Sequence, residues 1–306
     1  MIDPAPARPF PPGHVRNLGA AVATGDYLLF YDVDLCCGPG FVDGVRRWIT
    51  AGPGPTDFLM APCLYLSEQG TARLRFVGAP VDLSPHLASA LGGDNAMVDH
   101  FAVSTSTVVV AAAHFRRLGG NRAEYAGHGC EDFDMLHRLA SYSPRGRRPA
   151  DYYVDQRTRF PGDYQGFRAY FLQYALPHVF GDLLTAHLWH PRPIHRRYFR
   201  QREHNEALLQ AKMREHDALP AMPPLPAPWA TGDAPEALPP RQLIPKVMAE
   251  LGRDVVAQPG LLRWQPGVTP HVVALRNRAR KLVRPRELML DARGAAQRLL
   301  ARTRRG

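Results

Sequence analysis

Residues 16–35 read RNLGAAVATGDYLLFYDVDL, an apolar run that ends in two closely spaced acids. The aromatic and aliphatic residues from 26 to 33 predict a buried strand. Asp32 and Asp34 come at its C-terminal end, where open α/β sheets bind ligands, and strand alternation would point both side chains the same way. Two carboxylates at this spacing suit Mg²⁺ or Mn²⁺, which complete their coordination with phosphate oxygens and water. A DxD alone is more often a turn or a cap, and the strand before it is what favours a metal site.

A second acidic group lies in GHGCEDFDMLHR, residues 127–138. The spacing predicts a helix over 131–142, with Phe133, Leu136 and Leu139 on its inner face. Acids are ordinary in the first turn of a helix, because its exposed N–H groups favour negative charge there. Glycines that let the backbone approach a ligand, followed by adjacent carboxylates, also suit a site that takes a proton from a substrate hydroxyl. The stretch alone leaves both interpretations open.

A third motif, HLWHPRP, begins at His187 and includes His190. The HxxH spacing puts both imidazoles on one helical face, or close together in an irregular turn, so either could complete a metal site begun by the aspartates. Each histidine taken singly is more often a surface or core residue. An imidazole added to an acidic site shifts its preference from Mg²⁺ towards Mn²⁺.

The remaining elements predict an α/β fold with helices on the faces of a sheet. Strand-length apolar runs occupy 57–66 and 107–112, and residues 41–49 have helical spacing. Strands that alternate with helices are typical of this class.

The chain is predicted to divide into three parts. A catalytic domain covers 1–217, and a proline-rich linker, too proline-broken for a helix or central strand, covers 218–245. A basic helical tail follows over 246–306. The tail is either a peripheral anchor for an anionic membrane or a helix that is solvated or packed on the domain.

Composition narrows the classes of protein. The chain has 306 residues, 45% of them hydrophobic, and no apolar run approaches a membrane span or a signal peptide, so a cytoplasmic location is the default. Four cysteines without CxxC spacing disfavour a disulfide framework and a zinc site. The net charge of +10 comes almost entirely from arginine, with no nucleic-acid-binding motif beside it, so we expect no nucleic-acid partner.

The order and spacing of the three motifs, over residues 14 to about 195, resemble inverting glycosyltransferases of the GT-A fold. They are most similar to the β-1,4-galactosyltransferase and chondroitin-polymerase type and to bacterial capsule-synthesis transferases. The resemblance implies a Rossmann-like mixed sheet with helices on both faces. It also implies transfer of a sugar from a nucleotide-diphosphate sugar, expected to be UDP-linked, to a saccharide or lipid-linked saccharide, with Mn²⁺ or Mg²⁺ as cofactor.

The resemblance also assigns residues to roles. It makes Asp132 the catalytic base with Glu131 beside it, and it puts Asp34 and His190 on the metal, with Asp32 at the ribose or the metal shell. His187 is a further metal candidate by geometry alone. Arg16, Asn17 and Gly129 are expected near the sugar nucleotide.

Two departures from the family pattern stand out. His128 occupies the position where the family usually has a tryptophan that supports the acceptor sugar, so the acceptor is left open. Only a short proline-rich segment precedes Arg16, where the fold usually supplies a strand, a helix and a second strand, so the sequence is expected to be N-terminally incomplete. Two other functions therefore stay open: a degenerate transferase-like scaffold or partner-binding protein, and a membrane-surface or nucleic-acid binder that acts through the basic tail.

Overall fold

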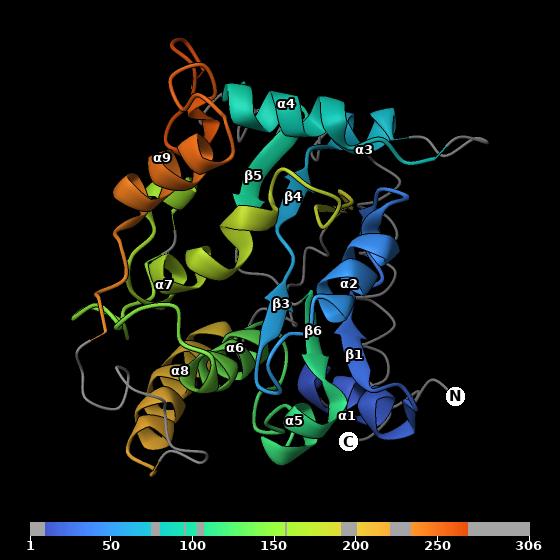
Figure 1. Cartoon of the computed structure of the whole chain (residues 1–306), viewed down its shortest axis with the longest axis vertical. Helices are drawn as coiled ribbons and strands as arrows, with labels where there is room; N and C mark the ends of the chain where they lie inside the picture. The colour runs from blue at the N-terminus through green and yellow to red at the C-terminus, as the bar shows by residue number, and fades with distance from the viewer. Residues whose placement is uncertain are drawn as a thin grey trace, which may run out of the picture.

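A computed structural model describes residues 10–74, 80–94, 96–102, 107–156, 158–190, 201–220 and 234–268. Strands and helices alternate along the chain (Figure 1), which confirms the α/β class. The strands are β1 (Tyr27–Phe30), β2 (Leu35–Cys37), β3 (Phe58–Met60), β4 (Cys63–Leu66), β5 (Val98–Ala102), β6 (Val108–Ala111) and β7 (Thr185–His187). The helices are α1 (Pro12–Val22), α2 (Phe41–Thr50), α3 (Glu68–Arg73), α4 (Ser84–Gly92), α5 (Ala112–Arg117), α6 (Glu131–Tyr142), α7 (Gly166–Ala175), α8 (Arg202–Asp217) and α9 (Pro240–Glu250), with short 3₁₀ turns at Pro161–Asp163, Leu176–His178 and Pro259–Leu261.

The strands form two sheets, and the chain passes from one to the other between β1 and β2. The first sheet has the order β1-β6-β3 and is antiparallel, with Leu29 opposite Val109. The second has the order β2-β7-β4-β5, in which β4 and β7 are parallel and the other pairs are antiparallel. The sheet system is therefore mixed.

The single strand predicted over 57–66 is wrong, because this segment forms β3 in one sheet and β4 in the other. Ala61 and Pro62 lie at the break. Proline has no N–H to donate to a ladder, so a strand is readily interrupted there. The Pro62 carbonyl instead accepts hydrogen bonds from the backbone N–H and the hydroxyl of Thr185, which brings β7 alongside β4.

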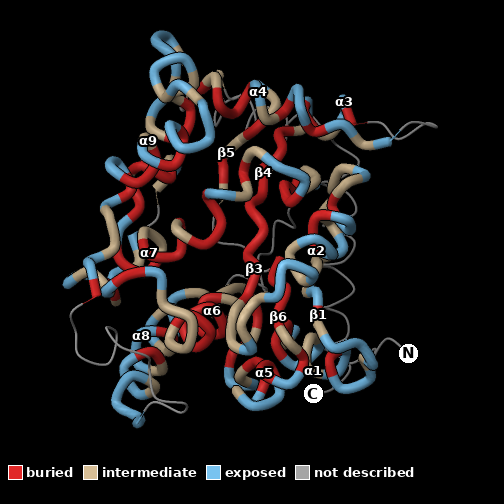
Figure 2. Tube along the Cα trace, viewed as in Figure 1, coloured by how far each residue is buried: buried red, intermediate tan, exposed pale blue. Residues whose placement is uncertain are grey.

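Both faces of β3 and β6 are buried, whereas Leu29 of the edge strand β1 is exposed. Leu59 and Val109 pack with Phe41 and Val45 of α2 on one face. The alternate residues of β3 and β6 point to the other face, into the main core that α6 and α7 complete. Figure 2 shows β3 and β6 as mostly buried and the outer turns of the surrounding helices as exposed. Helices on both faces, as expected, enclose the sheet.

Two predicted helices are confirmed, and α1 is among the helices that the sequence did not indicate. The helix over 131–142 is α6, with its three predicted inward side chains buried, and the helix over 41–49 is α2 with one further residue. Sequence reasoning did not place a helix over RNLGAAV, but α1 begins at Pro12 and runs through it. Proline is favourable in the first turn, where its missing N–H would have no helical partner.

The extended conformation predicted for 218–245 is wrong at its C-terminal end, because α9 begins at Pro240. Leu243, Ile244 and Met248 are buried in the main core, and this burial stabilises the helix although it contains a proline. The basic segment 271–305 lies outside the described residues. None of the helices in the part of the chain that the structure describes is long and apolar enough to cross a bilayer.

Candidate active site

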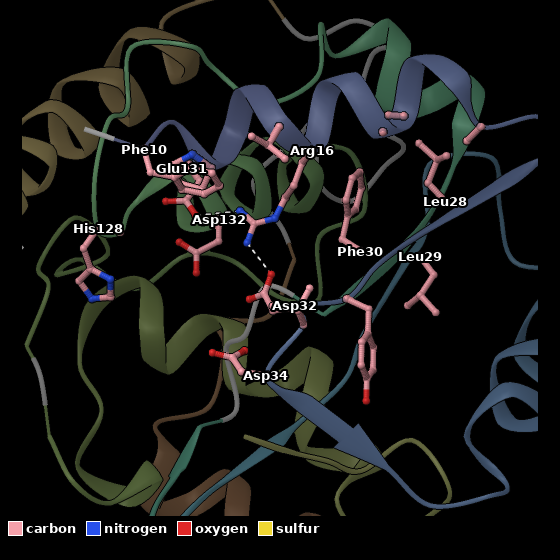
Figure 3. Close-up of a pocket in the computed structure, with 18 of the residues that line it drawn as sticks. Phe10, Arg16, Leu28, Leu29, Phe30, Asp32, Asp34, His128, Glu131 and Asp132 are labelled. Atoms are coloured by element: carbon pink, nitrogen blue, oxygen red, sulfur yellow. Dashed lines mark hydrogen bonds and ion pairs between the residues drawn. The ribbon is translucent and has the colours of Figure 1, made fainter. Parts of the chain in front are cut away.

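A cavity of about 720 Å³ lies between α1, the C-terminal end of β1 and the start of α6. Asp32, Asp34, Glu131 and Asp132 line it together, although almost a hundred residues separate the two acidic pairs in sequence. Figure 3 shows the carboxylates of Asp32, Asp34 and Asp132 directed towards one shared space, with His128 at its side. The structure therefore brings together the two acidic motifs that the sequence singled out.

The two aspartates reach the cavity from a turn and not from the strand itself. β1 ends at Phe30, and Asp32 and Asp34 occupy the turn that leads into β2. The intervening Val33 is fully exposed, with 104% relative accessibility. The predicted strand alternation is therefore wrong at this point, because the chain must leave the first sheet to join the second. The prediction that both acids face one site holds, and the turn geometry accounts for it.

Arg16 links three elements around the cavity. From α1, its guanidinium donates to Asp32 Oδ1 at 2.9 Å and to Glu131 Oε1 at 2.7 Å. The Arg16 side chain is 17% exposed and that of Glu131 only 7%, so the bond to Glu131 is shielded from water, whereas Asp32 is 40% exposed. Charge-assisted bonds of this kind hold the turn after β1 and the first turn of α6 in a fixed relation.

Asn17, the neighbour of Arg16, does not line the cavity. Its side-chain amide donates to the Asn121 carbonyl at 2.7 Å and accepts from the Asn121 N–H at 2.8 Å. Gly120 has φ +69°, and a Cβ there would come within 2.6 Å of the Asn17 oxygen, so only glycine fits. The contacts of Asn17 fix the loop after α5, and its expected place near a sugar nucleotide stays a prediction.

The three acids at the start of α6 have different surroundings. Asp134 is 1% exposed and is paired with Arg122 and Arg138, which makes it a structural residue. Glu131 turns towards Arg16. Asp132 accepts a hydrogen bond from the Phe133 N–H and borders the cavity. Ion pairing therefore accounts for Asp134, whereas Glu131 and Asp132 line the cavity.

Burial changes the proton affinity of this pair. Glu131 is 5% exposed, and burial, with the nearby charge of Asp132, raises its pKa to about 7. Burial also raises the pKa of Asp132, against the opposing effect of Arg16. Among the described residues, Glu131 Oε2 has no hydrogen-bond partner. Carboxyl groups with raised pKa values at a cavity are suited to exchange protons with a bound hydroxyl near neutral pH.

A side chain of α8, which is distant in sequence, fixes the loop before α6. Gly129 has φ +91° and Cys130 has φ +81°, a left-handed conformation that is uncommon for a residue with a side chain. From α8, the Asn205 side-chain NH₂ donates to the carbonyl oxygens of Ala126, His128 and Gly129, at 3.0, 3.3 and 3.1 Å. Both His128 and Gly129 line the cavity. No sequence motif indicated Asn205.

A cluster of three metal-binding residue types stands at the edge of the cavity. The Nε2 atoms of His187 and His190 lie 3.1 and 3.5 Å from Asp34 Oδ2, and one ligand atom from each residue falls within 4.8 Å of the others. The hydrogen bond from His187 lowers the pKa of Asp34, which keeps this carboxylate ionised. One carboxylate oxygen and two imidazole nitrogens are a donor set that fits a divalent ion.

The strand β7 explains how this cluster forms. β7 ends at His187, which lies opposite Leu35 of β2, the residue after Asp34. His190 follows in the chain after β7, so the helical arrangement considered for HxxH is wrong, and the turn is the correct alternative. The Leu188 N–H also donates to the Asp34 carbonyl at 2.8 Å. Backbone pairing therefore sets the distance between the DxD turn and the histidines.

The mixed α/β sheets, with the DxD turn and the carboxylate pair of α6 at one cavity, fit the GT-A fold. The chain belongs to the glycosyltransferase-like family 2, whose family model matches residues 2–215. It is therefore a glycosyltransferase, with a nucleotide-sugar donor and a saccharide acceptor. No curated protein matches the chain closely enough to serve as a named relative.

Proposed function

We propose that this chain is an inverting, metal-dependent hexosyltransferase that uses a UDP-linked sugar. Its motifs resemble the β-1,4-galactosyltransferase and chondroitin-polymerase type, so we assign it to capsule or surface polysaccharide synthesis in the cytoplasm. The observation that carries the proposal is a shared cavity: Asp34, from the Asp–His–His cluster, and Asp132, from α6, both line it. A transferase needs a site for a leaving diphosphate and a proton acceptor for the incoming hydroxyl, on opposite sides of one sugar carbon.

The leaving-group side is assigned to Asp34, His187 and His190. A divalent ion bound there supplies positive charge to the departing nucleoside diphosphate. Two nitrogen donors disfavour Mg²⁺, which prefers an all-oxygen shell, and favour Mn²⁺. Asp32 is held by Arg16 at the same end of the cavity, where a ribose hydroxyl or a metal-bound water would meet it.

The acceptor side is assigned to α6 and the loop before it. Asp132 removes the proton from the acceptor hydroxyl as that oxygen attacks the anomeric carbon. Attack from the face opposite the diphosphate inverts the configuration at that carbon. Glu131 is held by Arg16 through one oxygen, and its second oxygen is available to orient an acceptor hydroxyl. His128, at the cavity wall, is the side chain offered to the acceptor ring.

The test combines a donor screen with one substitution. Calorimetry should detect binding of UDP and UDP-sugars that requires Mn²⁺, and the wild-type protein should release UDP when a suitable acceptor saccharide is present. Asp34→Ala should abolish the Mn²⁺-dependent binding while circular dichroism stays unchanged. Asp43→Ala provides the matched control, because Asp43 is exposed on α2 and pairs only with Arg46 among the contacts described. Equal Mn²⁺ affinity in the Asp34 and Asp43 variants would contradict the metal assignment.

A further inference from the structure

Three aromatic rings are stacked beside the candidate metal cluster. The ring of Tyr65 lies between the imidazoles of His100 and His187, with centroid distances of 4.3 and 4.6 Å. The interplanar angles are 17° and 15°, so the faces are almost parallel. The ring of His190 follows, 5.4 Å from that of His187. The stack therefore leads from the second sheet to the candidate metal ligands.

The sheet register produces this stack. Tyr65 of β4 is the cross-strand partner of His100 of β5 and of His187 of β7. Residues directly opposite in neighbouring strands share one face of a sheet, with their Cβ atoms about 5 Å apart. The three rings therefore meet because three strands pair, and a strand slip of one residue would remove Tyr65 from between them.

We propose that Tyr65 is a positioning residue for the metal site, on which His187 is held in the orientation that directs its Nε2 towards Asp34. The proposal rests on the proposed function, because it requires the Asp34–His187–His190 cluster to bind a divalent ion. A stacked ring restricts rotation of the imidazole about its χ angles, so His187 does not lose that freedom when the ion binds. Residues that orient a metal ligand typically change metal affinity by about 10- to 100-fold when they are replaced.

The alternative is that the stack only packs the sheet. A packing residue would affect folding stability and leave the ligands of the folded protein unchanged. The two roles can be separated by counting imidazoles on the ion. Pulsed electron paramagnetic resonance of bound Mn²⁺ detects directly coordinated imidazole nitrogens, independently of turnover.

The experiment compares Tyr65→Phe with Tyr65→Leu in the full chain. We expect the phenylalanine variant, which keeps the stacked ring, to retain the wild-type Mn²⁺ affinity and two coordinated imidazoles. The leucine variant should bind Mn²⁺ about tenfold more weakly and show one coordinated imidazole. Tyr153→Leu is the control, because Tyr153 stands outside the cavity lining and contacts Asp217 and Tyr152.

A double-mutant cycle with His187→Ala tests whether Tyr65 acts through His187. If it does, the combined Tyr65→Leu and His187→Ala variant binds Mn²⁺ no more weakly than His187→Ala alone. Should Tyr65→Leu not fold, His100→Leu removes the outer ring and is expected to weaken Mn²⁺ binding about threefold.

The outcomes separate a failure of the positioning role of Tyr65 from a failure of the proposed metal site. If His187→Ala leaves Mn²⁺ affinity unchanged, the proposed metal site is wrong and the positioning role fails with it. If His187→Ala weakens binding but the folded Tyr65→Leu variant, or the His100→Leu variant in its place, keeps wild-type affinity and two imidazoles, only the positioning role is overturned. Additive losses in the cycle would likewise overturn it.

Discussion

Replacing Arg16 with leucine tests how the cavity is held together. The Arg16 guanidinium pairs with Glu131, whose side chain is 7% exposed, and with Asp32, whose side chain is 40% exposed. Arg16→Leu removes both pairings and leaves the Glu131 carboxylate buried beside Asp132, without its cationic partner. We expect the loss of stability to come mainly from Glu131, because the Asp32 carboxylate can be hydrated.

The expected loss of unfolding free energy follows from how deeply each carboxylate partner of Arg16 is buried. Removing one member of a buried ion pair costs about 3–5 kcal/mol, whereas a half-exposed pair contributes about 0–1 kcal/mol. At pH 8, therefore, Arg16→Leu should lower the free energy of unfolding by about 3–5 kcal/mol. The exposed pair between Arg46 and Asp43 offers a matched comparison, because Arg46→Leu should cost no more than about 0.5 kcal/mol.

The effect should depend on pH in a defined direction. The pKa of Glu131 is about 7 in the fold and about 4.5 in the unfolded chain, so between these values the folded state keeps a proton that the unfolded state has lost. The contribution of this carboxyl to stability is therefore full below about pH 4.5 and is lost as the pH rises through 7. Since Arg16 lowers the pKa of Glu131, removing it raises that pKa further. At pH 5 Glu131 is already neutral, and only hydrogen bonds worth about 1–2 kcal/mol are lost.

Urea unfolding followed by circular dichroism at pH 5 and pH 8 measures both values. The double variant Arg16→Leu with Glu131→Gln removes the buried charge, and at pH 8 it should recover at least about 2 kcal/mol relative to Arg16→Leu alone. Two results would refute this account of the Arg16 ion pairs. One is a loss of unfolding free energy below about 1 kcal/mol at pH 8, and the other is an equal loss at both pH values without recovery in the double variant.

Three further predictions concern catalysis, the metal and the tail. Asp132→Asn should lower turnover by about 10²- to 10⁴-fold with donor binding little changed, whereas Glu131→Gln should act mainly on acceptor affinity. Steady-state kinetics with the true donor and acceptor measure both effects, and a reversal of the two would contradict the assignment. His190→Ala should raise the Mn²⁺ concentration needed for half-maximal activity more than His187→Ala does, and titration with Mn²⁺ would show the opposite order if the motif were misassigned. Removing residues 269–306, which leaves the buried Leu261 in place, should reduce co-sedimentation with anionic liposomes, because each basic residue near such a surface contributes about 1 kcal/mol. Unchanged co-sedimentation would rule out a membrane role for the tail.

Much of the site was predictable because its elements obey local rules. Helix α6 follows from apolar spacing, and its bounds agree with the prediction over 131–142. The shared direction of Asp32 and Asp34 was predicted correctly from the wrong local structure, because a turn replaces the last part of the strand. Sequence periodicity does not indicate where a chain changes sheets, so the end of β1 was not foreseen.

The features of the site and fold that the sequence did not predict depend on contacts between residues far apart in the chain. Arg16 was expected near the nucleotide, but its two carboxylate partners come from the turn after β1 and from α6, which only the folded chain brings together. Tyr65 has no motif, although strand periodicity would have put it on one face with Cys63. The helix α9 contradicts the extended conformation inferred from its prolines, because the burial of Ile244 and Met248 outweighs the helix-breaking tendency of Pro245.

The contact between Asn205 and the loop before α6 bears on how specificity can diverge. Asn205 binds carbonyl oxygens of the main chain, which every amino acid supplies, and makes no use of the side chain at 128. These three hydrogen bonds therefore do not depend on which side chain stands at 128. A substitution at position 128 therefore changes the side chain at the cavity wall while the groups that bond Asn205 are kept. A change at Asn205, in contrast, would release three carbonyl groups at once and is expected to be rare among active variants.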